Sequence, residues 1–374
     1  MTATATPTKK RKSSGVHLDL SALRAALATV SPAVPGKASK PILMNVLLGS
    51  GLLTASDLEL QIQTTLDFHD DALLLPAARL SQILDPKTTG TASDATLAPD
   101  GTSCTVSVGR GSWKLPTEAA GEYPTWEPAD ATPVCRLPAD QFCRAVRSVA
   151  YATDNESSRY ALGAVLVEVK DGSVHFVGTD GRRLSVYEAE VDQAVDDRTV
   201  LIPARAIAVM ARVAAHSEGA VQLEATGNEV IAECDGTTVT ARLTDGRFPR
   251  WRDTLPERDA KSSLVSASEL LAATRQAAIC TSEQSLGVQF VFTQDGIHLT
   301  GRAAEAGESS VTCPLEQFGQ ACSVKLDPRF VIDFLRHLDD LAVPVEIEAV
   351  DAGSAVILRC DDATGVIMPL AQDA

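Results

Sequence analysis

The sequence lacks the short motifs that mark the common enzyme classes. Its 374 residues contain no G-x-S-x-G nucleophile elbow, no phosphate-binding P-loop, no G-x-G-x-x-G dinucleotide fingerprint and no H-E-x-x-H metal motif. Asp180 and Asp245 are each followed by glycine, and an Asp-Gly turn accounts for both carboxylates without catalysis. We therefore expect no catalytic residue and no cofactor, which favours an accessory or binding protein over an enzyme.

Metal and redox motifs are missing as well. The eight cysteines and six histidines are scattered singly, with no C-x-x-C and no H-x-x-H spacing. Zinc sites and dithiol redox sites need such spacings, so neither is expected. Isolated cysteines of this kind are typical of buried, small apolar residues in a compartment that keeps thiols reduced.

Long hydrophobic runs are also absent. No apolar stretch approaches the roughly 18 residues of a membrane helix, and no apolar segment follows the basic residues near the start. We therefore expect no membrane partner and a cytoplasmic, nucleoid-associated location. The formal net charge of −16 argues against coating nucleic acid with the whole surface, but it leaves room for a local basic face.

What the chain does contain is one pattern repeated three times, at a period of about 120 to 127 residues. The first amphipathic helix of each copy contains LSALRAALATV, DQFCRAVRSVAYA or SELLAATRQAAI, and the second contains LPAARLSQIL, IPARAIAVMARV or LDPRFVIDFLRHL. Proline near the start of each second helix suits the first helical turn. Alternating strand-like runs separated by Gly, Asp and Asn turns fill the remainder, which predicts an α+β fold.

Proline-rich joints set the expected domain boundaries. The joints EYPTWEPADATP and RFPRWRDTLPERD predict three domains at 16–130, 131–256 and 257–374. Residues 1–15, MTATATPTKKRKSSG, have no apolar periodicity and are expected to form a disordered basic tail. The KKRK run could contact DNA phosphates or act as an import signal, but a solvated tail is the simpler interpretation.

The six expected helices carry an excess of positive charge. Over 19–30, 76–84, 138–151, 203–214, 267–279 and 327–337 there are nine arginines and five acidic residues, in a chain that is strongly acidic. One interpretation is ordinary solvated helix faces. The other is a single surface that meets a polyanion through sequence-independent phosphate contacts. The arginines are Arg24, Arg79, Arg144, Arg147, Arg205, Arg212, Arg275, Arg329 and Arg336.

The stretch from Thr244 to Pro256, TDGRFPRWRDTLP, combines an Asp-Gly turn with a tryptophan, three arginines and two prolines. Because proline cannot donate to a sheet, the segment is expected to leave the sheet as an extended strap. By composition it could be a linker between domains, or one wall of a groove that binds a partner.

Five motifs in order give the chain a family resemblance: KPILMNVLL, GTDGRRLS, LIPARAIAVMARV, TDGRFPRWRDTLP and VIMPL. From about Leu18 to Leu370 it resembles the bacterial replicative sliding clamp, the β subunit of DNA polymerase III. The resemblance implies a DNA clamp fold of three tandem repeated domains, each with two helices packed on antiparallel sheets. It also implies a ring-shaped, head-to-tail homodimer that encircles double-stranded DNA as a processivity factor in DNA replication.

The resemblance further implies partners that bring short linear motifs to a pocket between the second and third domains. The polymerase catalytic subunit, the clamp loader and repair polymerases are such partners. The matching groove residues are Leu162, Thr179, Gly181, Arg182, Arg183, Leu184, Pro249, Asp253, Thr254, Val366, Ile367, Met368, Pro369 and Leu370. A groove of apolar walls with a few polar anchors suits a short apolar peptide.

Two more sets of candidate residues come from the helix charge count and the resemblance together. The helix arginines Arg24, Arg79, Arg144, Arg147, Arg205, Arg212, Arg275 and Arg329, with Lys37, are the candidate DNA contacts, and Lys37 and Arg205 match basic contact positions of the family. The expected dimer interface joins Arg110, Trp113 and Leu115 of the first domain to Ile279, Glu305 and Glu308 of the third.

The sequence departs from the family pattern at the strap and at the C-terminus. Asp253 stands where the family usually has Arg, Thr254 replaces an apolar residue, and the chain continues as AQDA beyond Leu370. These changes make the rim more acidic, so partners with acidic flanks are expected to bind less well. The acidic side of the dimer joint is also thinner than in the family. The changes at the strap and the C-terminus leave an alternative open: a divergent clamp paralogue acting in repair, or a peptide-binding scaffold that does not encircle DNA.

Overall fold

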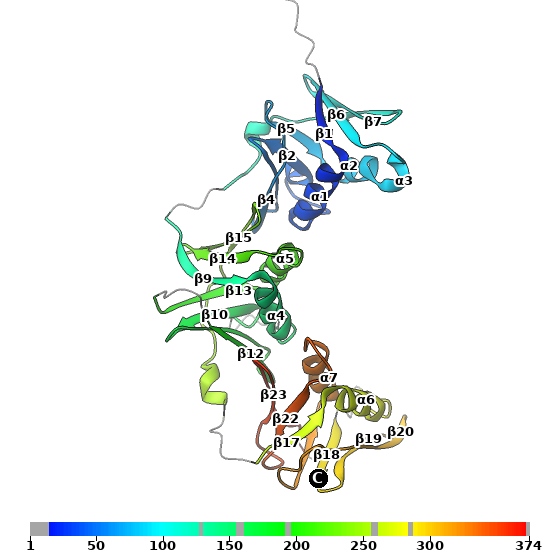
Figure 1. Ribbon diagram of the computed structural model, residues 1–374, viewed down its shortest axis with the longest axis vertical. Helices are drawn as coiled ribbons and strands as arrows, with labels where there is room; N and C mark the ends of the chain where they lie inside the picture. Colours follow the sequence, from blue (N-terminus) through cyan, green and yellow to red (C-terminus); the bar gives the residue numbers. More distant parts are fainter. Residues whose placement is uncertain are drawn as a thin grey trace, which may run out of the picture. The chain divides into compact units, whose positions relative to one another are not determined.

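The computed structural model describes residues 15–126, 130–154, 161–190, 196–255, 261–282 and 287–371. Figure 1 labels its helices and strands in chain order. The chain forms two compact units. Unit 1 contains Met1–Asp130 with Ile231–Ala241, and unit 2 contains Ala131–Val230 with Arg242–Ala374. Most of the second repeat therefore shares a unit with the third, while its residues 231–241 belong to unit 1. The three-domain division at 130 and 256 stays a prediction.

Unit 1 packs a helix pair against two groups of antiparallel strands. Its helices are α1 (Leu20–Val30), α2 (Ala77–Leu84) and the short α3 (Pro86–Thr89), which the sequence did not suggest. One sheet has the order β1-β6-β7-β8, formed by Val16–Asp19, Asp94–Asp100, Ser103–Val108 and Gly111–Pro116. The other strands run β5-β2-β3-β4, formed by Leu73–Pro76, Asn45–Gly49, Leu52–Ser56 and Leu60–Thr65, and β16 (Thr237–Arg242) pairs with β4.

Unit 2 is organised around one eight-stranded antiparallel sheet. Its order is β13-β10-β11-β12-β24-β23-β22-β17, formed by Arg198–Pro203, Ala164–Lys170, Ser173–Thr179, Arg183–Glu190, Ala363–Ile367, Val356–Cys360, Pro344–Glu348 and Ser263–Ser266. A four-stranded sheet follows the order β20-β19-β18-β21, formed by Gly307–Cys313, Gly296–Ala303, Val288–Thr293 and Cys322–Leu326. Strands β9 (Thr132–Pro138) and β14 (Ala220–Ala225) pair, and β15 spans Glu229–Cys234. The helices are α4 (Ala139–Ala150), α5 (Ala204–Ala214), α6 (Ala267–Ala278) and α7 (Pro328–Arg336).

Strand order confirms the expected three-fold repetition. The same four-strand arrangement recurs as β5-β2-β3-β4, β13-β10-β11-β12 and β21-β18-β19-β20, and in each copy the first helix precedes these strands and the second follows them. The α+β class and the two main helices of each repeat are therefore as predicted, and the helix ends lie within about two residues of the expected ones.

The helices begin at capping or proline residues, but the predicted position of proline needs one correction. Asp19 caps α1 by accepting a hydrogen bond from the Ala22 N–H at 2.7 Å, and Asp327 caps α7, which has Pro at its first position. Pro76 and Pro203, by contrast, are the residues before α2 and α5 and end the preceding strands. There the fixed φ of proline serves the strand-to-helix corner rather than the first helical turn.

The helices lie close to the sheets because glycine is present at the contacts. A Cβ at Gly178 in β11 would overlap the carbonyl oxygen of Val149 in α4, and one at Gly301 in β19 would overlap that of Ala277 in α6. The two glycines therefore permit the same helix-on-sheet approach in the second and third repeats. In the described residues, no helix combines the length and apolar character needed to cross a membrane.

Candidate functional site

A tight turn between β11 and β12 forms the first wall of the candidate groove. The Asp180 carboxylate accepts hydrogen bonds from the backbone N–H groups of Arg182 (2.9 Å) and Arg183 (3.0 Å). The Thr179 hydroxyl donates to the carbonyl of Arg183 at 2.6 Å and accepts from the Gly181 N–H at 3.1 Å. Gly181 has φ +85°, a conformation that side chains rarely adopt. Asp180 is thus a turn residue, as the Asp-Gly pair predicted.

Pairing of β12 with β24 brings the C-terminal motif beside this turn. Leu184 lies opposite Val366, and the Met368 N–H donates to the carbonyl of Arg182 at 2.9 Å. The side chains of Leu184 and Val366 are buried, whereas Met368 is 46% exposed. Two segments that are far apart in the sequence therefore meet, with an exposed methionine next to a buried apolar floor.

The strap that begins at Thr244 lies over this buried floor and is not a free linker. The Thr244 N–H donates to the carbonyl of Leu201 at 2.9 Å, which holds the start of the strap on the sheet. Trp251 is only 6% exposed and belongs to a buried cluster with Leu166, Val177, Leu184, Val186 and Val366. Residues Trp251–Thr254 form a 3-10 turn, so the expectation of a wholly extended strap is wrong. A turn lets the indole reach down into the cluster.

Charged groups hold the outer side of the strap. The Arg252 guanidinium is ion-paired with Glu168 and lies over the Trp251 ring, with its carbon 4.1 Å from the ring centroid. The His175 ring is 5.4 Å from the same indole. Burial lowers the pKa of His175 below its ordinary value, so the imidazole is neutral at neutral pH and adds no charge beside Arg252.

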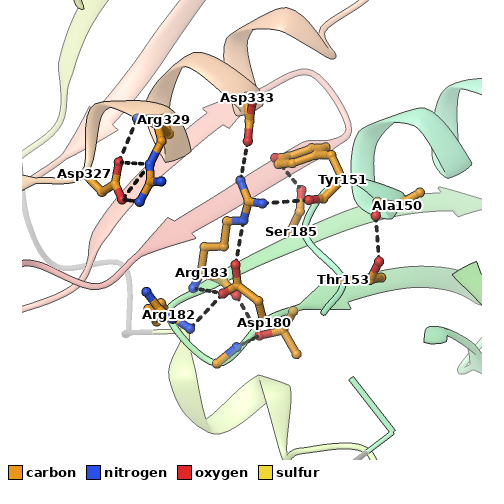
Figure 2. A network of polar contacts seen from close by, with 12 residues as sticks. Ala150, Tyr151, Thr153, Asp180, Arg182, Arg183, Ser185, Asp327, Arg329 and Asp333 are labelled. Carbon is orange, nitrogen blue, oxygen red and sulfur yellow. Dashed lines mark hydrogen bonds and ion pairs between the residues drawn. The ribbon is translucent and has the colours of Figure 1, made fainter. Parts of the chain in front are cut away.

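Arg183 links the turn to α7 (Figure 2). Its guanidinium donates to Asp180 at 3.0 Å, to Asp333 of α7 at 2.7 Å and to the carbonyl of Tyr151 at 2.7 Å. Its side chain is 13% exposed, and the guanidinium also lies 4.7 Å from the centroid of the Phe330 ring. Such multiply bonded, poorly solvated pairs are strongly coupled to the packing around them.

The predicted groove residues differ in exposure. Leu162, Thr179, Leu184, Val366 and Ile367 are buried; Arg183, Pro249, Pro369 and Leu370 are partly buried; Gly181, Arg182, Asp253, Thr254 and Met368 are exposed. Buried apolar residues beside an exposed methionine and polar rim residues suit a shallow peptide groove. Residues 372–374 of the AQDA extension lie outside the described residues, and so do Pro256 and the KKRK tail. The expected weak binding of acidic-flanked partners stays a prediction.

Three of the predicted groove residues point elsewhere. Ile367 follows Val366 in β24, and successive strand side chains alternate between faces, so Ile367 lies on the opposite face of the sheet. The Leu370 N–H donates to the carbonyl of Lys325 at 2.8 Å, which turns the chain end toward β21. The Arg183 guanidinium is occupied by the contacts described above, so this residue shapes the turn instead of facing a ligand.

Most of the candidate DNA contacts lie on the surface. Lys37, Arg79, Arg147, Arg205, Arg212, Arg275 and Arg329 are exposed, and Arg24 and Arg144 are partly buried. Several already have partners within the chain. Arg329 pairs with Asp327 at 2.6 Å, and Arg144 pairs with Asp140 at 3.1 Å. The positive character of the helices is therefore partly balanced by local carboxylates.

The prediction that Arg24 contacts a DNA phosphate needs a correction. Its Nε donates to the carbonyl of Leu84 at 2.6 Å, and its Nη2 donates to the Thr89 hydroxyl. Leu84 ends α2 and Thr89 ends α3, so the guanidinium caps the carbonyl of Leu84 and ties the ends of the two helices together. The sequence offered no signal for this role, because both partners are about 60 residues away.

The candidate dimer residues lie on or near strands at sheet edges. β8 is an outer strand of its sheet in unit 1, and β20 is an outer strand in unit 2. Ile279 is 75% exposed, and Arg110, Glu305 and Glu308 are exposed, although Glu308 pairs with Arg302 at 2.7 Å. Leu115 corrects the prediction: it is buried on the same strand face as the partly buried Trp113, so its side chain serves its own core.

The described residues offer little for covalent or metal chemistry. They contain no group of three or more His, Cys, Asp or Glu residues arranged to hold a metal ion. Burial raises the pKa of the Cys135 and Cys313 thiols to about 12, so neither is an effective nucleophile at neutral pH. The site does offer an apolar floor, an exposed methionine and a hydrogen-bonded turn, which suit the binding of a peptide.

The fold is that of a DNA sliding clamp. Residues 136–250 match the family model described as the DNA polymerase III beta subunit, central domain, and residues 252–371 match that of its C-terminal domain. The chain belongs to the DNA polymerase III beta subunit family.

Known relatives support this assignment over nearly the whole chain. It is 26% identical to the beta sliding clamp of Synechococcus elongatus over 342 residues, which covers 87% of this chain and 91% of the relative. It is also 26% identical to that of Vibrio cholerae over 354 residues, covering 92% and 96%. The crystal structure of the sliding clamp from Pseudomonas aeruginosa matches with a TM-score of 0.88 at 24% identity, covering 96% of this chain and 100% of that one.

We predict that Arg183→Gln lowers the free energy of unfolding by about 2–3 kcal/mol, because it leaves the Asp180 and Asp333 carboxylates without their cation. Denaturant unfolding followed by tryptophan fluorescence measures the change. Arg182→Gln is the matched control, since the neighbouring side chain is exposed, and it should shift stability by less than about 0.5 kcal/mol. Equal effects of the two substitutions would contradict the role given to Arg183.

Proposed function

We propose that this protein is a DNA sliding clamp that encircles duplex DNA and tethers the replicative polymerase to it. The observation that carries the proposal is the likeness to sliding clamps along the whole repeat array, which spans 96% of the chain. On this proposal the protein is a processivity subunit without a catalytic site of its own, and it acts on DNA at the nucleoid.

The proposed ring consists of two chains joined head to tail. Strand β8 of one chain would meet β20 of the next, which gives each edge strand the hydrogen-bond partners that it lacks alone. Ile279 is the exposed apolar residue available at this joint, and Arg110, Glu305 and Glu308 are the charged ones. Because the two surfaces differ, the contact is heterologous and must close on itself to form a ring.

DNA would be held inside this ring by its topology and by weak contacts to its phosphates. The proposed contacts are the exposed cations Lys37, Arg79, Arg147, Arg205, Arg212, Arg275 and Arg329, with the partly buried Arg144. Arginine and lysine contacts to phosphates carry no base information, so binding would be independent of sequence and sensitive to salt. Such contacts suit a protein that must move along the duplex.

Partners would dock a short apolar peptide in the groove of unit 2. Leu184 and Val366 supply the floor, Pro249 the edge of the strap and Met368 an exposed apolar contact at the entrance. We propose that the polymerase catalytic subunit, the clamp loader and repair polymerases all use this groove. Methionine suits a shared site, because its flexible thioether can repack against different side chains.

We expect the loaded protein to remain on nicked circular DNA and to slide off once the circle is cut. A closed ring cannot leave a circle without opening, whereas a free DNA end offers an exit. Gel filtration of the complex before and after linearisation measures the retained fraction. Equal retention on both forms, or on neither, would overturn encirclement and leave a peptide-binding scaffold.

Peptide binding tests the groove separately. We predict that Met368→Ala weakens binding of a QLxLF-type peptide by about 1–3 kcal/mol, because the bound peptide would bury this side chain. Calorimetric titration of the full chain gives the affinity. Met44→Ala is the control, since Met44 is a similarly exposed methionine (41%) in the first repeat. Unchanged affinity in the Met368 variant would place the peptide elsewhere.

A further inference from the structure

Two of the proposed DNA contacts share one carboxylate within the chain. Arg144 and Arg147 lie three residues apart on α4, which puts them on one face of the helix. Asp339, just beyond the end of α7, pairs with both: its carboxylate is 3.5 Å from Arg144 Nε and forms a close ion pair with Arg147. All three side chains remain substantially exposed, at 43%, 47% and 41%.

The end of α7 is held next to α4 by contacts that do not involve Asp339. The rings of Tyr151 and His337 stack with their centroids 4.5 Å apart and an interplanar angle of 15°. Arg183 joins Asp333 of α7 to the carbonyl of Tyr151. These contacts fix the distance between the helices, so the position of Asp339 opposite the two arginines follows from the packing and does not depend on its own ion pairs.

We propose that Asp339 is an internal competitor for the DNA backbone, occupying Arg144 and Arg147 when no phosphate is present. This rests on the proposed function as a clamp around DNA. A phosphate and a carboxylate are similar acceptors for a guanidinium, so DNA gains these arginines only by displacing Asp339. The exchange replaces one ion pair with another and keeps the contact weak, which suits a ring that holds DNA by topology.

The solvent exposure of these ion pairs determines how strongly Asp339 weakens DNA binding. An ion pair at the surface contributes little, because water solvates both partners and salt screens them. Removing the competitor should therefore strengthen DNA binding modestly, by about two- to fivefold at low salt. It should also steepen the salt dependence, by up to about 0.9 in the logarithmic slope for each arginine that gains a phosphate.

Asp339→Asn tests the proposal with the smallest change of shape. Fluorescence anisotropy of a labelled duplex, titrated with the full chain at several salt concentrations, gives both the affinity and the salt slope. Asp340→Asn is the matched control: it removes the same charge from the adjacent exposed position, and its Oδ1 contact is only to the Ala342 N–H at 2.8 Å. We expect tighter binding and a steeper slope for Asp339→Asn, and a clearly smaller gain for Asp340→Asn.

The arginines provide the second arm. In an Arg144→Gln, Arg147→Gln background, adding Asp339→Asn should bring no gain, because no masked cation remains. Equal gains from Asp339→Asn and Asp340→Asn would mean that only net charge matters, and would overturn the proposal. An unchanged or weaker affinity of Asp339→Asn, with an unchanged melting temperature, would overturn it too. A wild-type chain that binds no duplex at any salt concentration would overturn this inference, whereas the clamp function is tested separately by retention on nicked circular DNA.

Discussion

The pairing of β12 with β24 is the interaction on which the candidate site depends. It joins strands of the second and third repeats into one eight-stranded sheet, with Leu184 opposite Val366. The turn after β11 and the C-terminal motif become neighbours only through this pairing. A shift of one residue would move Val366 to the other face and put Ile367 in its place, so the register itself defines the groove floor.

Two further contacts stabilise that sheet from opposite sides. Trp251 packs on the outer face and carries the strap with it, while Arg183 connects the turn to α7. Neither residue has to contact a partner to matter for binding, because each fixes the position of groups that would. The proposed groove would thus be pre-organised, which reduces the ordering cost of binding a peptide.

Arginine has several different roles in this chain. Arg183 and Arg24 are bound to carboxylates, carbonyls or hydroxyls inside the chain and serve its architecture. Arg144 and Arg147 are shared with an exposed aspartate, and Arg212 and Arg275 are exposed on their helices. A count of arginines on helices cannot separate these roles, because an arginine adds one to the count whether it is bonded inside the chain or exposed.

Much of the fold could be predicted from the sequence, since the repeat, the helix periodicity and the Asp-Gly turns are local signals. The family motifs also predicted that Leu184, Val366 and Met368 belong to one groove. Long-range side-chain contacts could not be found in this way. Asp333 is 150 residues from Arg183, and nothing in its surroundings indicates that it would pair with that residue. The burial of Leu115 likewise follows from which face of β8 the core covers.

The central claim is that two chains close into one ring, and the molar mass in solution tests it most directly. Light scattering on the full chain should give a value near twice 39.4 kDa, independent of concentration once the dimer has formed. A stable mass of one chain would contradict ring closure. A mass that keeps rising with concentration would contradict it as well, because a head-to-tail contact that does not close builds an open filament.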